Sequence, residues 1–297
     1  MDLIKFVTQF AGKRATPAFA PTDIASLRYW IKADTGLFQD AEGTTPATAD
    51  GDVVGLWKDQ SGNAYDVSQA TTEKKPLLKL TTNGINNRAA VLFDGSNDIL
   101  VRTVANWLSG DSAGSVFIVV QLDTIADLMA ALATADEGGT AYYMMFNPYY
   151  QNDAAGRPLR VMQRNNDTGD FVRVDDILAV DTAYVAAYRS SGTAYTIRMN
   201  GVDRTLTVVA GSNTGDWFAD TANRDNMSVG GVKRSAEAYF TNGLIAEIIA
   251  YGDNLTGDDL TNVETYLADR YGVELQYAIT TSVDFDSGSA DSVGVEL

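Results

Sequence analysis

Residues 91–100 read VLFDGSNDIL, with an apolar run on each side of an Asp-Gly turn. Apolar and β-branched residues favour extended backbone, whereas Gly, Asn and Asp tolerate the positive φ that tight turns require. The stretch therefore predicts a strand near 89–93, a turn, and a second strand near 99–103.

The same pattern recurs from Leu27 onward and indicates a chain built from many short strands. Between two of these strands, Asn200-Gly201 is a strong signal for a type I′ hairpin, because both turn residues then need positive φ. Many short strands with turn residues between them indicate a sandwich or jelly roll. Further strands are expected near residues 27–32, 53–57, 64–68, 116–122, 142–146, 159–163, 171–174, 184–188, 195–199, 204–208, 227–229 and 244–251.

One helix is expected near residues 257–271. Thr256 is the expected N-cap, with Asp259 as its capping-box partner. Gly272 is the expected left-handed residue at the C-terminal end. Four apolar residues recur at the spacing of one helical face, which predicts that they pack on the sandwich: Leu260, Val263, Leu267 and Tyr271.

Three segments stand in a fixed order along the chain: Leu56–Asn63 with Lys75-Pro76, Asn83–Leu100, and Gly243–Tyr251 with the helix ending in Tyr266–Gly272. Together they resemble the laminin G-like, concanavalin A-like lectin/glucanase jelly roll in the form found in bacteriophage virion proteins and bacterial surface proteins. The resemblance covers about residues 23–275. It implies an all-β, concanavalin A-like jelly-roll sandwich with one C-terminal packed α-helix and, here, an N-terminal arm. The fold carries many functions, so the resemblance bears on architecture more than on activity.

Residues 1–22 are expected to form an N-terminal attachment arm and linker, residues 23–275 the jelly-roll domain, and residues 276–297 a C-terminal tail with room for one extra strand. The apolar residues of the arm fit one face of a short helix that is unstable alone, so we expect them to dock on a partner. A frayed terminus is the alternative, and polar interruptions of the apolar run predict no signal peptide. The arm residues are Leu3, Ile4, Phe6, Val7 and Phe10.

The chain contains 22 basic and 39 acidic residues, which gives a net charge of −17. Nucleic acids and anionic membranes both select basic surfaces, so neither is expected as a partner. Histidine and cysteine are absent from the sequence. Their absence excludes His-dependent nucleophiles, disulfides and the usual zinc, haem and iron–sulfur sites.

Three aspartates, Asp59, Asp94 and Asp98, lie in the turns of the first two segments. Their carboxylates are of the kind that calcium prefers as ligands. Their spacing matches no D-x-D-x-D-G loop, which favours solvated turn residues. We therefore expect no cofactor, with calcium at these aspartates as the alternative.

Four aromatic residues are candidates for glycan binding, because aromatic rings stack on the apolar faces of sugars. Tyr149 and Tyr150 follow a proline after the aromatic-rich strand near 142–146, and Trp217 and Phe218 lie in a polar loop. The alternative places these rings at the edge of the sandwich or in a subunit interface, where Tyr and Trp are enriched.

Glucanases of this fold carry an E-x-D-x-x-E cluster on one strand, which places two carboxylates on the same face. No such cluster occurs in this sequence, and Glu247 stands isolated on an apolar strand. We therefore expect no enzymatic activity.

These observations favour a non-enzymatic bacteriophage virion structural or adhesion protein: a head decoration or fibre, or a tail receptor-binding part with a lectin-like body. Its expected partners are other virion proteins through the arm and a cell-surface glycan, and it is expected to form a homo-oligomer in the virion. The alternative is a carbohydrate-binding lectin module of a bacterial or phage surface protein, at the cell surface or outside the cell. A glycan-degrading enzyme is the third hypothesis.

Overall fold

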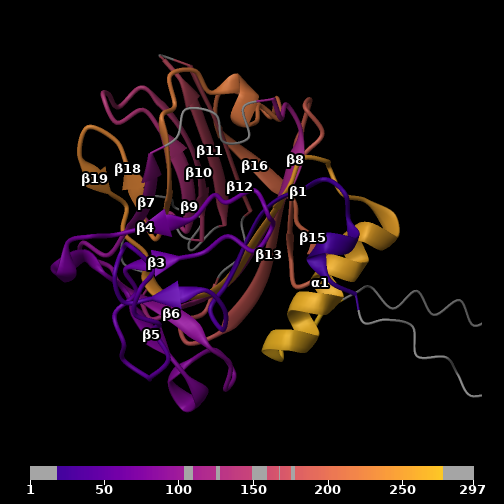
Figure 1. Cartoon of the computed structure of the whole chain (residues 1–297). Coiled ribbons are helices and arrows are strands. Elements are labelled where there is room, and N and C mark those ends of the chain that lie inside the picture. Colours follow the sequence, from indigo (N-terminus) through magenta and orange to yellow (C-terminus); the bar gives the residue numbers. More distant parts are fainter. Residues whose placement is uncertain are drawn as a thin grey trace, which may run out of the picture.

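The computed structural model describes residues 19–103, 110–124, 128–148, 159–166, 168–174 and 178–276. It confirms the expected fold class, because two antiparallel sheets form a sandwich and one α-helix follows near the C-terminal end (Figure 1). The arm residues Leu3, Ile4, Phe6, Val7 and Phe10 lie outside the described residues, as does most of the expected tail. The boundaries at 22 and 275 therefore stay predictions. No helix within the described ranges has the length and apolar character to cross a membrane.

Sheet A contains eight strands within the described residues, in the order β15-β14-β13-β8-β20-β6-β5, with β1 also paired to β20. Strand β20 is central, because it pairs with β8 along one side and with β6 and then β1 along the other. The strands are β15 (Val202–Asp203), β14 (Tyr195–Met199), β13 (Ala183–Ser190), β8 (Gly114–Leu122), β20 (Asn242–Tyr251), β6 (Ala90–Asp94), β5 (Leu77–Lys79) and β1 (Leu27–Lys32).

Sheet B contains ten strands within the same described ranges, in the order β16-β12-β11-β10-β9-β17-β7-β4-β3-β2. A separate hairpin pairs β18 (Val232–Lys233) with β19 (Glu237–Ala238). The strands of sheet B are β16 (Leu206–Ala210), β12 (Thr168–Val174), β11 (Arg160–Asn165), β10 (Tyr142–Asn147), β9 (Leu132–Ala135), β17 (Asn226–Val229), β7 (Leu100–Thr103), β4 (Val67–Ser68), β3 (Leu56–Trp57) and β2 (Leu37–Phe38). Short 3₁₀ helices occupy Pro21–Asp23, Thr72–Lys74, Thr81–Asn83 and Phe218–Asp220.

Sheet A is apolar on both faces, because sheet B covers one face and the helix α1 (Gly257–Tyr271) covers the other (Figure 1). Strand β8 shows the alternation that this arrangement needs. Val116 and Ile118 belong to the core between the sheets, whereas Phe117 and Val119 belong to the core beneath the helix. The long apolar runs of β8 and β20 therefore follow from burial on two sides.

Helix α1 confirms the expected buried face, since Leu260, Val263, Leu267 and Tyr271 are all buried. Gly272 has φ 62°, as expected for the residue that ends the helix. The capping prediction is wrong in its chemistry. Thr256 occupies the N-cap position with extended backbone, but its side chain makes no capping hydrogen bond.

Most expected strands are present. Some begin or end at other residues than expected, and further strands form where contacts with neighbouring strands favour them. The strands expected near 53–57 and 64–68 shorten to β3 and β4. Strand β9 was not predicted, because its sequence Leu-Ala-Thr-Ala has little β propensity, yet all four residues are buried between β10 and β17. The Asn200-Gly201 turn is confirmed, with φ of 50° and 81° between β14 and β15.

Replacing Leu267 by Ala should lower the free energy of unfolding by about 2–5 kcal/mol, because it leaves a cavity between α1 and sheet A. Thr256→Ala should stay within about 0.5 kcal/mol of wild type, because the hydroxyl makes no capping bond. Urea unfolding measures both. A Thr256 effect near 1 kcal/mol would show that the hydroxyl caps the helix in solution.

Candidate functional site

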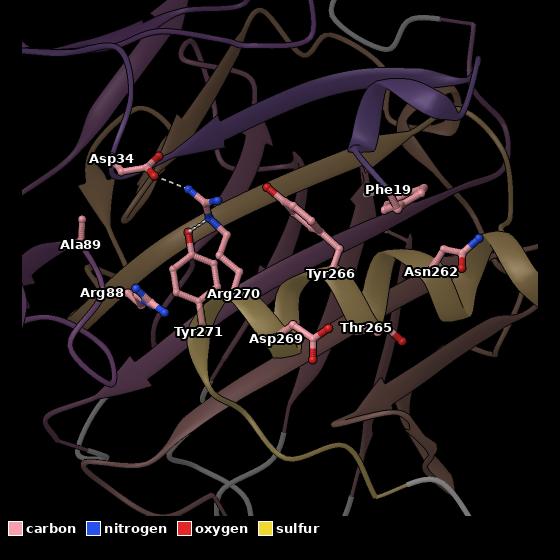
Figure 2. A pocket seen from close by; sticks show the side chains of 10 residues that line it. All are labelled: Phe19, Asp34, Arg88, Ala89, Asn262, Thr265, Tyr266, Asp269, Arg270 and Tyr271. Carbon is pink, nitrogen blue, oxygen red and sulfur yellow. Dashed lines mark hydrogen bonds and ion pairs between the residues drawn. The ribbon is translucent and has the colours of Figure 1, made fainter. Parts of the chain in front are cut away.

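A cavity of about 620 Å³ lies beside the exposed side of α1. Figure 2 shows that Tyr266 and Arg270 point from the helix toward Asp34, while Thr265 and Asp269 point to the opposite rim. The remaining walls come from the chain before β1 and from the turn before β6. The lining residues are Phe19, Asp34, Arg88, Ala89, Asn262, Thr265, Tyr266, Asp269, Arg270 and Tyr271.

The acidic side chain of Glu247 lies beneath this cavity because strand β20 bulges. Its pairing with β8 shifts register between Ile245 and Glu247, close to where β20 changes partner from β6 to β1. A bulge places two successive residues on one face. Ala246 accordingly packs in the core beneath α1, and the adjacent Glu247 bonds to residues of the same helix.

Glu247 is fully buried and is held by four donors. Its Oε1 accepts hydrogen bonds from Trp30 Nε1 at 2.6 Å and from the Tyr266 hydroxyl at 3.0 Å. Its Oε2 accepts one from the Tyr271 hydroxyl at 2.8 Å and lies 3.2 Å from Arg270 Nε. Burial raises the pKa of Glu247, and the hydrogen bonds from Trp30 and Tyr271 oppose that rise. The carboxylate therefore fixes three residues that line the cavity.

Arg270 links the buried carboxylate to the cavity wall. One guanidinium nitrogen, Nη2, bonds to Asp34, as Figure 2 shows, while Nε faces Glu247 and the Tyr271 hydroxyl. Lys32 Nζ lies 3.9 Å from the other carboxylate oxygen of Asp34. The Arg270 guanidinium is thus fixed by carboxylates on two sides.

Arg88 reaches the cavity from a turn whose backbone conformation depends on Gly84, Asn86 and Asn87. Asn86 and Asn87 have φ of 47° and 64°, a region that asparagine tolerates better than most residues. A Cβ at Gly84 would lie 1.9 Å from the Arg88 carbonyl oxygen, so only glycine fits there. Asn86 Nδ2 donates to the Tyr271 carbonyl at 2.9 Å and ties the turn to the end of α1.

One side of the cavity is aromatic. The rings of Phe19 and Tyr266 meet edge to face with their centroids 6.1 Å apart. Asn262 stands one helical turn before Tyr266 and adds an exposed amide. The cavity therefore combines an apolar ring surface with amide, carboxylate and guanidinium groups, and several of these are held in place from beneath.

Trp217 and Phe218, two of the predicted glycan-binding residues, are core residues instead. Each is only 1% exposed, and both rings contact Phe146 of sheet B, at 5.3 and 5.7 Å. Neither ring offers a face to a sugar, because the polar loop around them folds them inward. Tyr149 and Tyr150 lie outside the described residues.

Asp59 is a structural residue of its turn. Its Oδ1 accepts from the backbone amides of Trp30 and Ser61, and its Oδ2 accepts from the Ser61 hydroxyl and the Tyr65 amide, at 2.7–3.0 Å. These donors occupy the oxygens that calcium would need. The carboxylate instead ties the 59–65 turn to β1.

Asp94 and Asp98 hold the next turn together. Asp94 Oδ1 accepts from the amides of Ser96, Asn97 and Asp98, and Asp98 Oδ2 accepts from the Asp94 amide. Burial and the Asp94 carboxylate raise the pKa of Asp98 to about 6. In the part of the chain that the structure describes, no three acidic side chains group to hold a metal ion. The residues present do not fit the calcium alternative.

The sequence does not predict this cavity, because its walls come from four segments that lie far apart along the chain. Glu247 was the one usable signal, since a lone acid inside an apolar strand must find partners when it is buried. Glu247 is the one acid of β20, as its sequence shows, and its four donors come from β1 and α1.

No protein-family model matches the chain, and no curated protein matches its sequence. Among solved structures, a Trypanosoma rangeli sialidase in complex with sialic acid aligns with 15% identity and a TM-score of 0.53, over 84% of this chain and 34% of the sialidase. A Ruminococcus gnavus IT-sialidase CBM40 bound to α2,3 sialyllactose aligns with 18% identity and a TM-score of 0.44, over 51% of this chain and 82% of that module. At these identities the likeness to the T. rangeli sialidase shows a shared lectin-like β-sandwich fold, and this chain spans about a third of that enzyme.

Replacing Glu247 by Gln should lower the free energy of unfolding by about 3 kcal/mol at pH 7, because an amide cannot accept from all four donors and leaves Arg270 without its buried partner. Urea unfolding at fixed salt measures the loss. Glu73→Gln is the matched control at an exposed glutamate and should stay within about 0.5 kcal/mol. Equal behaviour of the two variants would contradict a structural role for the carboxylate.

Asp98 should make the wild-type protein less stable as the pH rises from about 4 to 7. Its folded pKa of about 6 exceeds the ordinary value of 3.8, so the folded state binds more protons across this interval. This pKa difference corresponds to a loss of at most about 3 kcal/mol in the free energy of unfolding. Asp98→Asn should flatten this dependence of stability on pH, because an amide does not titrate. The turn should be kept, because the amide oxygen can still accept from the Asp94 backbone amide. Thermal unfolding across the pH range measures it, and the exposed control Asp253→Asn should keep the wild-type slope.

Proposed function

We propose that this chain is a carbohydrate-binding protein without catalytic activity, and that the cavity beside α1 is its sugar site. The observation that carries the proposal is the cavity itself. In it, the Phe19–Tyr266 ring surface shares one cavity with the side chains of Asn262, Asp34 and Arg88, on a lectin-like sandwich.

The chemistry of a saccharide matches these walls. A sugar ring presents an apolar face of C–H groups to an aromatic ring, and its hydroxyls both donate and accept hydrogen bonds. Carboxylates accept from hydroxyls, a guanidinium donates to them, and an amide does both. Because Glu247 fixes Tyr266 and Arg270 before any ligand arrives, little ordering is needed on binding.

The structural neighbours support this proposal over the virion structural role. The T. rangeli sialidase binds a sugar by its own description. Their fold is shared, but their ligands pass to this chain only as part of the proposal. A virion or surface location is compatible with sugar binding and stays an expectation.

We propose that the chain has no catalytic activity, because the carboxylates of Glu247 and Asp34 are already engaged by neighbouring side chains. Glu247 is buried behind Tyr266 and Tyr271 and is held by four donors, so it has no free oxygen for a substrate. Asp34 is engaged by Arg270. Most glycosidases use one protonated and one ionised carboxyl group on opposite sides of the bond that breaks, whereas sialidases use a tyrosine nucleophile. In this cavity the hydroxyls of Tyr266 and Tyr271 both donate to Glu247.

A glycan array probed with the full chain should identify bound saccharides, and Arg88→Ala should weaken binding to them about twofold to tenfold, because one solvent-exposed hydrogen-bond donor is lost. Titration calorimetry on the best array ligand measures the change.

Arg164→Ala is the matched control, since Arg164 lies in sheet B and away from the α1 cavity. It should bind like wild type. Loss of binding in Arg164→Ala but not in Arg88→Ala would place the site elsewhere, and release of reducing sugar from a bound glycan would contradict the absence of catalysis.

A further inference from the structure

The charged groups around the α1 cavity balance each other. Strand β1 and the residues after it contribute Lys32 and Asp34, the turn before β6 contributes Arg88, and α1 contributes Arg270 and Asp269. Glu247 lies beneath them. The lining itself therefore carries two cations and two anions, with Lys32 and the buried Glu247 beside it, and the cavity has no excess of positive charge with which to attract an anion.

Arg270 is the cation best placed to bind an acidic ligand, but carboxylates already hold it. Its Nη2 bonds to Asp34 and its Nε faces Glu247 at 3.2 Å. A carboxylate that approached Arg270 from the cavity would lie beside Asp34 and repel it. Recognition of a planar carboxylate works best when an arginine offers two parallel donors. Two of the three guanidinium nitrogens of Arg270 already face carboxylates, so a further carboxylate would have to share this cation with Asp34 and Glu247.

Arg88 is the other guanidinium in the lining. It is exposed, so salt and water screen its charge. The net charge of −17 on the whole chain also repels anions from the surface. An acidic ligand would thus gain one screened contact, with Arg88. It would be repelled by Asp34, by Asp269 and by the net negative charge of the chain.

A hydroxyl meets no such conflict, because it donates to Asp34 or Asp269 and accepts from Arg88 or Asn262. We infer that the α1 cavity takes neutral saccharides and discriminates against their acidic counterparts, such as sialylated or uronic-acid glycans. This inference rests on the proposed function and names the ligand class of the same site. The inferred ligands differ from those of the sialidase structures, whose sugars are acidic.

The test is an array of neutral glycans, each paired with a sialylated, sulfated or uronic-acid counterpart, probed with the full chain at low and at high sodium chloride. We expect signals on the neutral members that change little with salt. The acidic members should bind more weakly at low salt and gain as salt screens the repulsion.

Two variants test whether charge causes the preference. Asp269→Asn removes one carboxylate from the rim and should shift the ratio of acidic to neutral binding by about twofold to fivefold toward acidic glycans. Asp258→Asn, in the first turn of the same helix, is the matched control and should leave the ratio unchanged.

The outcomes separate the two proposals. Stronger binding of the acidic members, or an equal ratio in Asp269→Asn and wild type, overturns the inference and leaves carbohydrate binding standing. Binding to no glycan on the array overturns the proposed function, and the inference with it.

Discussion

A carboxylate that is buried between a sheet and a helix has to receive hydrogen bonds from both, and Glu247 places this requirement on the whole helix side of the sandwich. Its donors are Trp30 of β1 and Tyr266, Arg270 and Tyr271 of α1. The bulge in β20 supplies the position, and the helix supplies three of the four donors. Strand β1, the central strand and the helix are therefore linked through one side chain, in addition to their apolar packing.

The cavity beside α1 follows from the same contacts. The three helix residues that hold Glu247 also line the cavity, so a structural network and the cavity wall share their residues. Asn86 adds a second fixed point, because it bonds to the carbonyls of Tyr271 and Gly272 and so sets the position of Arg88 relative to the helix. Under the proposed function, this order before the ligand arrives would favour selectivity between similar sugars.

Local patterns in the sequence predicted the fold well, and they predicted the site poorly, for one physical reason. The apolar, β-branched run from Val116 to Val120 and the helical spacing of Leu260 to Tyr271 are signals within one segment. The cavity depends on Phe19, Asp34, Arg88 and Tyr266, which come together only through the sheet topology. Trp217 shows the converse error, since polar neighbours in sequence suggested exposure while the fold buries it against Phe146.

The central position of β20 also bears on how the chain is made. This strand begins at Asn242, yet it pairs with β1, β6 and β8, so sheet A cannot close while the ribosome is still adding the first 241 residues. Until then the nascent chain carries unpaired strand edges and the bare apolar surface of Phe117 and Val119, which are features that recruit chaperones or promote aggregation. Folding of sheet A therefore waits for β20, and premature termination before this strand yields a product without the centre of the sheet.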